Sequence, residues 1–121
     1  MLLDSNIFIY AVLAEHRSLR EWCFQQQVWA SEITRLEVLG YHRLSELDQR
    51  DLTQLFALAN IHPVSSQVVS QAIQLRQQRK MSLGDAVIAA TALEYRQTLA
   101  TRNVKDFDWI EGLQTIDPLK E

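Results

Sequence analysis

The 121-residue chain contains only one cysteine, two prolines and three glycines. A single cysteine, Cys23, excludes an internal disulfide, which fits a reducing cytoplasm. Its neighbours Trp22 and Phe24 favour a buried, apolar role for it. Glycine and proline are too sparse to form a linker, and there is no internal repeat or low-complexity tract. These absences predict one helix-rich domain, residues 1–121.

Long apolar runs are absent as well. No segment approaches the roughly 20 apolar residues that a membrane span requires. The opening Met1-Leu2-Leu3 has no basic segment before it and is interrupted at once by Asp4, which does not fit a signal peptide. We therefore expect a soluble cytoplasmic protein without a membrane partner.

Positive charge is not in excess, because the net charge is −3 and the isoelectric point is about 5.6. The overall charge thus gives no indication of nucleic-acid binding. A cluster of carboxylates would contribute to this negative charge, and a bound metal ion would offset it locally. The sequence also lacks a glycine-rich phosphate loop, a Gly-x-Ser-x-Gly elbow and a Cys/His metal finger, which excludes the corresponding classes of protein.

Short apolar segments alternate with helical ones. The pattern predicts strands at residues 1–4, 28–31, 60–63, 98–101 and 113–116, and helices at 6–13, 17–26, 34–45, 49–59, 66–79 and 83–96, with a helical turn near 104–107. This alternation is typical of an α/β fold with a short, mostly parallel central sheet of four or five strands and helices on both faces. Such a sheet has its ligand site at the carboxyl ends of the strands.

Acidic residues stand where strands end or helices begin. Asp4 closes the first strand, Glu37 follows the second, and Asp106 follows the fourth. Asp85 opens the apolar helix and lies after no strand, so topology alone does not bring it to the same edge. Carboxylates gathered at one edge predict a divalent-metal site.

Each acid taken singly also has a structural interpretation. Asp4 can cap a helix, and Thr34-x-x-Glu37 and Ser82-x-x-Asp85 both have the form of a capping box. The two interpretations are compatible, because the positive end of a helix dipole favours the ionised carboxylate that a hard cation needs.

Four motifs together resemble a known family. Leu3-Asp4-Ser5-Asn6, Thr34-x-x-Glu37, Gly84-Asp85-x-x-Ile88-Ala89 and Thr101-Arg102-Asn103-x-x-Asp106-Phe107 occur in this order. They resemble the PIN-domain family, and within it the VapC-like toxins of bacterial and archaeal toxin–antitoxin pairs, over residues 1–118. The resemblance implies a magnesium- or manganese-dependent ribonuclease, usually a homodimer, that is silenced by an antitoxin encoded beside it.

The resemblance also implies roles for individual residues. Asp4 and Asp85 would bind Mg²⁺ directly, and Glu37 and Asp106 would bind directly or through water, around one ion or two. The expected supporting residues are Ser5, Asn6, Thr101 and Asn103, and the candidate RNA contacts are Arg35, Arg102 and Lys105.

The sequence departs from the family at two positions. Position 5 is Ser where the family often has Thr, and position 103 is Asn where many members carry the fourth acid. Asp106 is therefore the candidate for the fourth acid, and Asp108 is its alternative. The basic group 76–80 is more typical of a solvated helix face.

Two other functions fit parts of the sequence. A PIN-like module that binds protein or RNA without cleaving it would use each acid as a cap or contact. A phosphatase of the haloacid-dehalogenase type also begins with an Asp at a strand end, but it needs an acid where this chain has Asn6. His16, His42 and His62 have no partner at helical spacing and do not predict a zinc site.

Overall fold

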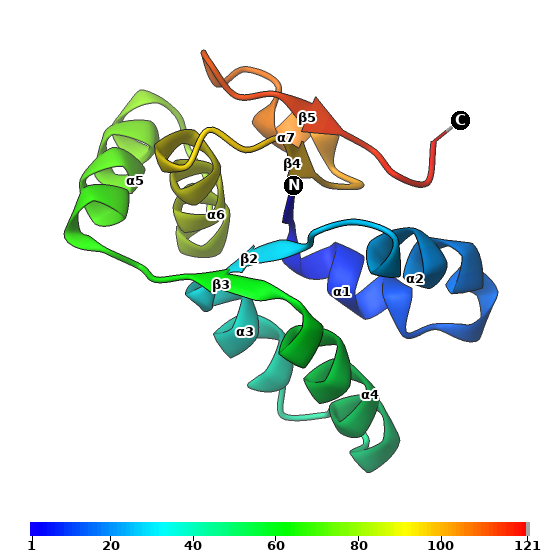
Figure 1. The fold of residues 1–121 in the computed structure, drawn as a ribbon. Coiled ribbons are helices and arrows are strands. Elements are labelled where there is room, and N and C mark those ends of the chain that lie inside the picture. The colour runs from blue at the N-terminus through cyan, green and yellow to red at the C-terminus, as the bar shows by residue number, and fades with distance from the viewer. Residues whose placement is uncertain (121) are drawn as a thin grey trace.

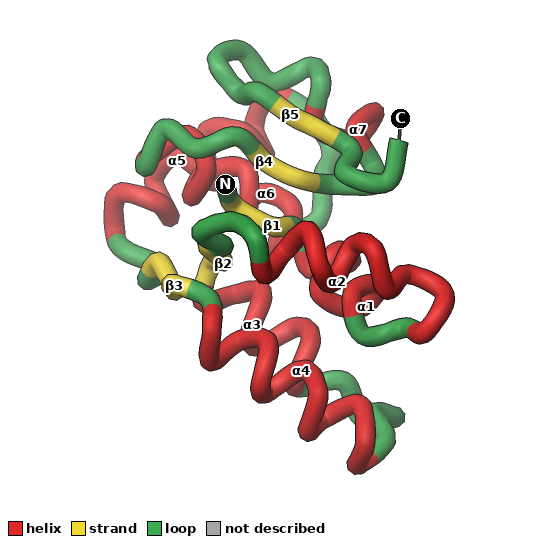
Figure 2. The backbone as a smooth tube through the Cα atoms, turned by 45° about the vertical axis from the view of Figure 1, so that its right-hand side comes forward, coloured by secondary structure: helices red, strands yellow, loops and turns green. Residues whose placement is uncertain are grey.

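A parallel sheet of five short strands forms the centre of the computed structural model, which describes residues 1–120. The strands lie in the order β3-β2-β1-β4-β5, and each neighbouring pair is parallel (Figure 2). The expected sheet of four or five mostly parallel strands is confirmed, with five strands. They are β1 (Leu2–Leu3), β2 (Trp29–Ser31), β3 (Asn60–His62), β4 (Leu99–Ala100) and β5 (Thr115–Ile116).

Helices cover both faces of this sheet. In Figure 1, α5 and α6 lie to the left, α1 and α2 to the right, and α3 and α4 below the sheet. A short 3-10 helix, η1 (Ala14–His16), precedes α2. The α-helices are α1 (Ser5–Ala11), α2 (Arg17–Phe24), α3 (Glu32–Leu39), α4 (Glu46–Leu58), α5 (Ser66–Gln78), α6 (Leu83–Glu94) and α7 (Val104–Phe107).

Two apolar cores result, because successive residues of a strand face opposite sides. Leu3 and Ala100 belong to a core shared with α1, α2, α3 and α4. Leu2 and Leu99 belong to a second core shared with α5, α6 and α7. Both residues of β1 and of β4 are therefore buried, as expected for central strands covered on both faces.

Serine residues in extended conformation begin four of the helices. Ser45, Ser65 and Ser82 each accept a hydrogen bond from the backbone N–H three residues on, at 3.0 to 3.2 Å. Ser31 accepts from the N–H of Ile33 at 3.2 Å. Each serine satisfies an N–H that the first helical turn leaves free, and so fixes where the helix begins.

The third helix corrects the sequence prediction. It was expected at residues 34–45 with Thr34 as its cap, but α3 begins at Glu32 because Ser31, the last residue of β2, caps it. It ends at Leu39, and Ser45 then starts α4 three residues earlier than expected. The capping-box interpretation of Thr34 is therefore wrong, because this residue lies inside α3 and is fully buried.

Three polar positions follow adjacent strands at the carboxyl edge of the sheet: Asp4 after β1, Glu32 after β2 and Thr101 after β4. The buried helix α6 brings its amino end to the same edge, which the interactions of Asp85 described below establish. Among residues 1–120, no helix combines the length and apolar character needed to cross a bilayer.

Candidate active site

Asp4 is the most deeply buried of the four predicted acids, with 4% of its surface exposed. It caps α1, and its Oδ1 accepts a hydrogen bond from the Ser5 N–H at 2.7 Å. Its Oδ2 accepts from the Thr101 hydroxyl at 2.8 Å. Burial raises the pKa of Asp4; the two hydrogen bonds oppose this, and the nearby charges of Glu37 and Asp106 add to it.

Asp85 lies in the first turn of α6, where its N–H donates to the Ser82 hydroxyl at 3.1 Å. Its pKa is raised first by burial and then by the charges of Asp4 and Asp106. Asp85 is thus a neighbour of both acids, although no strand precedes it. The role of Asp85 as a metal ligand, which the family resemblance implies, stays a prediction.

Glu37 reaches the site from the exposed side of α3. Its Oε1 accepts a 2.9 Å hydrogen bond from the hydroxyl of Ser5, which also lies 3.3 Å from the buried Thr34 hydroxyl. The Glu37 carboxylate lies directly against Gly84, where any side chain would collide with it. A glycine at position 84 therefore allows α3 and the start of α6 to approach closely enough for Glu37 and Asp85 to share the site.

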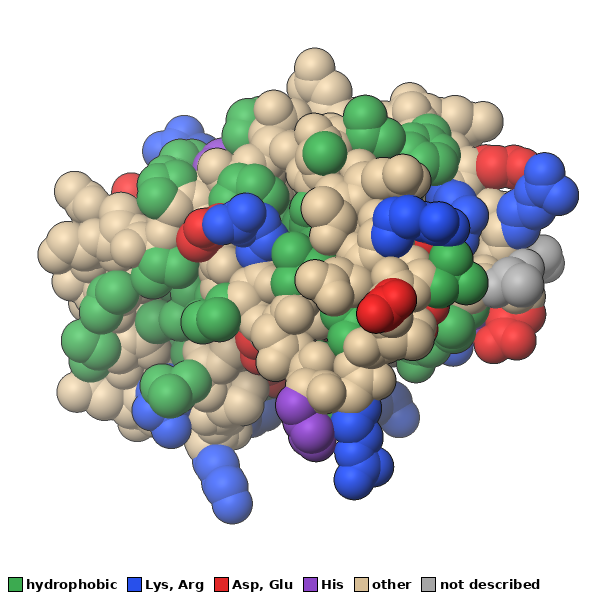
Figure 3. Space-filling view, turned by 90° about the horizontal axis from the view of Figure 1, so that it is seen from below, with side chains coloured by type: hydrophobic (Ala, Val, Ile, Leu, Met, Phe, Trp, Pro, Cys, Tyr) green, Lys and Arg blue, Asp and Glu red, His purple; other side chains and the backbone are tan. Residues whose placement is uncertain are grey.

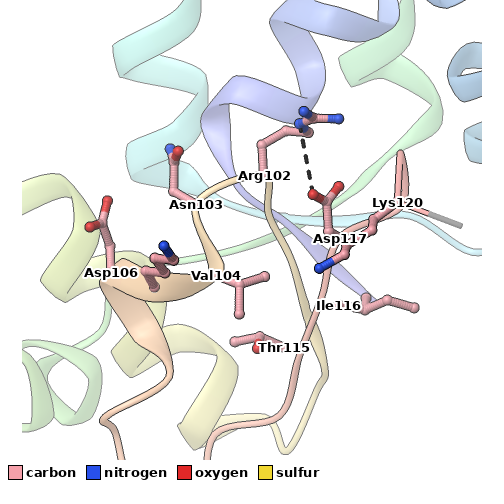
Figure 4. A pocket seen from close by; sticks show the side chains of 9 residues that line it. Arg102, Asn103, Val104, Asp106, Thr115, Ile116, Asp117 and Lys120 are labelled. Atoms are coloured by element: carbon pink, nitrogen blue, oxygen red, sulfur yellow. Dashed lines mark ion pairs between the residues drawn. The ribbon is translucent and has the colours of Figure 1, made fainter.

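Asp106 lies on α7, exposed beside the two buried acids. Its charge raises the pKa of both Asp4 and Asp85, whereas Asp108 contributes to neither shift. The Asp106 N–H donates to the carbonyl of Asn103 at 2.9 Å, and Figure 4 shows the side chains of Asn103 and Asp106 directed to the same side of the loop. Four carboxylates from four segments thus lie near one edge of the sheet, close enough for their charges to act on Asp4 or Asp85.

The PIN-domain family model matches residues 1–112. The chain belongs to the PIN-domain family. It is 29% identical to ribonuclease VapC1 of Rickettsia felis, over 96% of this chain and 94% of that protein. It is also 27% identical to ribonuclease VapC of Rickettsia bellii, over 100% and 98% of the two chains.

Solved structures of toxin–antitoxin complexes share the fold of this PIN domain. A chain of a toxin–antitoxin complex from Klebsiella pneumoniae superposes with a TM-score of 0.79 and is 33% identical, over 99% of this chain and 98% of that one. A chain of VapBC-1 from nontypeable Haemophilus influenzae gives a TM-score of 0.78 at 27% identity, over 96% of both chains.

The donor set of this PIN domain fits a hard divalent cation. All four acids offer carboxylate oxygens, which Mg²⁺ and Mn²⁺ prefer, and the buried Asp4 and half-buried Asp85 lie close to like charges. In the side-chain positions of this structure, no three acidic, His or Cys side chains of residues 1–120 already enclose one point. Free carboxylates repel one another, so a cation would draw them together by side-chain rotation, which the exposed Glu37 and Asp106 allow.

The supporting residues predicted from the sequence lie around these acids. Thr101 donates to Asp4, and its Oγ1 also accepts from the N–H of Asn103 at 3.0 Å. Ser5 links Asp4 to Glu37, as described above. Asn6 lies half-buried in the first turn of α1.

The predicted basic residues separate into two places. Arg102 and Lys105 line a cavity that Asp106 also lines. Arg35 instead forms a bidentate ion pair with Glu32, at 2.8 and 3.0 Å, and lines a different surface depression. Within the group 76–80, Arg79 lies over the Trp109 ring, 4.8 Å from its centroid.

Two further residues of the first cavity, Asp117 and Lys120, were missed by the sequence prediction. They lie ten and thirteen positions after the last motif, in a segment without a recognisable pattern. Their place near Asp106 follows from the pairing of β5 with β4, which brings the residues after both strands together.

Proposed function

We propose that this PIN domain is a metal-dependent endoribonuclease and the toxin of a toxin–antitoxin pair. The observation that carries this proposal is the meeting of Asp4, Glu37, Asp85 and Asp106 at one sheet edge. Like charges gathered around the buried Asp4 disfavour the fold unless a cation compensates for them. The similarity to proteins named ribonuclease VapC supports the reaction class, and the similarity to chains of toxin–antitoxin complexes supports the biological role.

In the proposed reaction, Asp4 and Asp85 would hold Mg²⁺ or Mn²⁺ directly, and Glu37 and Asp106 would act directly or through water. When bound, such a cation neutralises phosphate charge and makes a coordinated water more acidic. The Thr101 and Ser5 N–H hydrogen bonds keep the Asp4 carboxylate in one orientation. Glu37 and Asp106, both exposed, are placed to accept a proton from an attacking water and to align it with the phosphodiester.

A PIN-like module that binds without cleaving is not favoured. Helix capping explains why Asp4 and Asp85 stand where helices begin. It does not require the charges of Glu37 and Asp106 to lie near these two residues. A binding surface would also gain nothing from buried like charges, which cost stability at neutral pH.

The test is cleavage of a mixed RNA pool with and without Mg²⁺, using Asp85→Asn and Asp48→Asn as a matched pair. Both residues donate their N–H to the hydroxyl of the serine that caps their helix, but only Asp85 lies among the acids. We expect Asp85→Asn to lose at least about 100-fold in turnover, roughly 2.7 kcal/mol of transition-state stabilisation. Asp48→Asn should cleave like the unmodified protein. Equal activity of the two variants, both folded by circular dichroism, would refute the proposal.

The antitoxin partner of the proposal has a suitable surface beside the site. A cavity of about 270 Å³ between α1, α3 and α4 is lined by apolar side chains that include Ile9, Leu13 and Tyr41, with Glu37 at its edge. Ile9 and Tyr41 are exposed despite being large and apolar. A partner that fills this cavity would lie next to Glu37 and obstruct the acids.

The toxin role predicts that expression of this chain in the cytoplasm of a bacterial host slows the growth of that host. Expression of the Asp4→Asn variant should not. Co-expression of the reading frame immediately upstream should restore growth. Equal growth with soluble protein at similar levels would contradict the toxin role while leaving the ribonuclease activity to be measured separately.

The homodimer is part of the same proposal. The exposed Leu36 of α3 and Val64, which follows β3, line a surface depression, and burying them between two copies would remove apolar surface from water. Light scattering after gel filtration should give twice the 14.0 kDa chain mass. A mass of one chain at micromolar concentration would contradict the dimer.

A further inference from the structure

A cavity of about 750 Å³ lies directly beside the proposed active site. Asp106 and Asn103 stand at one end of it and Lys120 at the other (Figure 4). Between them, Val104, Thr115 and Ile116 form a largely apolar floor from α7 and β5.

Three cations line this cavity, Arg102, Lys105 and Lys120, against two carboxylates, Asp106 and Asp117. The cavity is thus net positive in a chain of net charge −3. On the face seen in Figure 3, Lys and Arg side chains are dispersed among acidic and apolar ones and form no single patch. Three basic side chains around one cavity are therefore a local concentration of positive charge.

The cation at the centre of this group is held in place. The Arg102 guanidinium lies 3.8 Å from the Asp117 carboxylate and 6.0 Å from the centroid of the Tyr10 ring. Contacts on two sides restrict a side chain that would otherwise lose considerable rotamer freedom on binding a ligand. Arg102 is therefore pre-organised toward the cavity.

The turn after β5 places the second cation. Asp117 Oδ1 accepts a hydrogen bond from the Leu119 N–H at 3.0 Å, and the Asp117 carbonyl accepts from the Lys120 N–H at 3.2 Å. Leu119 packs against the apolar core of α1 to α4. Asp117 thus fixes both the backbone that carries Lys120 and the guanidinium of Arg102.

The loop after β4 joins this cavity to the acids. Thr101 faces inward and donates to Asp4, while the next residue, Arg102, faces the cavity. Within the same loop Lys105 lines the cavity next to Asp106. Arg102 and Lys105 are thus sequence neighbours of Thr101 and Asp106. A polyanion bound in the cavity would therefore extend directly to the carboxylates.

We propose that this cavity binds the phosphodiester backbone of a single RNA strand immediately to one side of the bond to be cleaved. The inference rests on the proposed ribonuclease function. Arg102, Lys105 and Lys120 contact successive phosphates, and Val104 and Ile116 pack against a ribose or base. Asp117 holds the backbone that carries Lys120 and partly neutralises Arg102, without contacting RNA.

The size of the cavity selects a single strand. Its volume is within the range of small-molecule pockets, roughly 300–1,000 Å³, which accommodates a short stretch of one chain. A duplex presents two backbones on a rigid cylinder and cannot enter a site of this size. Three of the residues that line the cavity are cations suited to phosphate oxygens, and phosphate contacts position a strand without reading its sequence.

The test is equilibrium binding of a short fluorescent single-stranded RNA to protein carrying Asp4→Asn, without divalent metal, so that cleavage does not interfere. Lys105→Ala and Lys120→Ala should each weaken binding roughly three- to tenfold and lower the slope of log affinity against log salt by about 0.7. The control is Arg50→Ala on α4, which lies at the far end of the molecule from β5 (Figure 1). It should change neither quantity.

A variant that removes a negative charge, in contrast to the lysine variants, completes the test. Asp117→Asn keeps an oxygen that can accept from the Leu119 N–H but removes the carboxylate that neutralises Arg102. It should tighten RNA binding at low salt, an increase that a merely structural role for Asp117 would not produce. Duplex RNA of equal length should bind more weakly and be insensitive to Lys120→Ala.

Each outcome decides the inference separately from the proposed function. Equal RNA affinity of the Lys105, Lys120 and Arg50 variants overturns the phosphate site, even if the unmodified protein cleaves RNA. The same holds if the Asp4→Asn parent has no measurable affinity, or if duplex RNA shows the same losses. Absence of cleavage by the unmodified protein, with the binding pattern intact, refutes the ribonuclease and not the phosphate site.

Discussion

The Thr101 hydroxyl donates a 2.8 Å hydrogen bond to Oδ2 of Asp4 across 97 residues of sequence. Both residues follow adjacent parallel strands, so the pairing of β1 with β4 brings them together. Thr101 has no exposed surface, and its oxygen also accepts the Asn103 N–H. One hydroxyl therefore orients a proposed metal ligand and begins the loop that carries Asp106.

Replacing Thr101 by Val tests this double role. The change keeps the side-chain shape but leaves the Asp4 carboxylate and the Asn103 N–H each without a partner, and it should cost about 1–3 kcal/mol of unfolding free energy. Thr101→Ser, which keeps the hydroxyl, should lose less. Urea unfolding at pH 7 measures both.

A purely structural role for Thr101 would affect stability alone. Because the hydroxyl orients Asp4, Thr101→Val should also raise the Mg²⁺ concentration needed for half-maximal cleavage, and Thr101→Ser should restore it. An unchanged Mg²⁺ requirement in a folded Val variant would contradict the orienting role.

Without metal, the acids should reduce stability at neutral pH. Burial and the charges of Asp4 and Asp106 raise the pKa of Asp85. A carboxyl with a raised pKa in the folded state contributes stability below its unfolded value of 3.8, and this contribution is lost as pH rises through the folded pKa. Asp85→Asn should therefore raise the melting temperature in EDTA at pH 7.

Mg²⁺ should raise the melting temperature of the unmodified protein and leave that of Asp85→Asn nearly unchanged. Asp48→Asn is the control, because it should retain the full response to Mg²⁺ and gain no stability in EDTA. A loss of stability in EDTA for Asp85→Asn would show that the residue acts mainly as a helix-capping charge.

His62 should make folding sensitive to mild acid. Its ring is stacked between Trp29 and Tyr95, with centroids 4.4 and 3.6 Å away, and it is hydrogen-bonded to Gln97 Oε1 at 3.2 Å. Burial lowers the pKa of His62 in the folded protein. A base with a lowered pKa stabilises the fold above its unfolded value of 6.5 and loses that contribution as pH falls through the folded pKa.

The unfolding free energy should consequently decrease as pH is lowered below 6.5. In His62→Phe, which keeps the stacked ring and removes the titrating group, the decrease should be smaller. Replacing the exposed His42 by Gln should leave the wild-type pH dependence intact. Urea unfolding at pH 7.5 and 5.5 compares the three proteins, and parallel changes in all of them would exclude His62 as the cause.

Sequence reasoning could predict much of the fold because strand and helix segments carried their own signals. The apolar segment Leu83–Leu93 predicted a buried helix, and seven of its residues are buried in α6. The boundaries of α3 were wrong because Ser31 serves as both the end of a strand and the cap of a helix. The periodicity of apolar residues cannot show which of two hydroxyl side chains, Ser31 or Thr34, caps the helix.

The candidate site divides in the same way. Asp4 and Asp106 could be placed from topology, since each follows a strand. Asp85 required family resemblance, because it reaches the edge through the packing of α6. Lys120 and Asp117 had no signal, since they join the cavity only through the pairing of β5 with β4.

The choice between Asp106 and Asp108 as the fourth acid gives the last prediction. The charge of Asp106 raises the pKa of Asp4 and of Asp85, and Asp108 affects neither. Asp108 is the residue that ends α7, and its N–H donates to the Val104 carbonyl at 2.9 Å. A position two residues further along a helix faces away from the first, so Asp108 should lie outside the metal site.

Asp106→Asn should therefore reduce turnover at limiting Mg²⁺ roughly 10- to 100-fold, and Asp108→Asn should change it little. Because Asp106 is exposed and acts at the edge of the site, raising Mg²⁺ or supplying Mn²⁺ should restore part of the lost activity. Both variants should unfold at similar urea concentrations, since neither side chain is buried. Equal losses from the two substitutions, or a loss from Asp108→Asn alone, would move the fourth ligand toward Trp109 and away from Asn103.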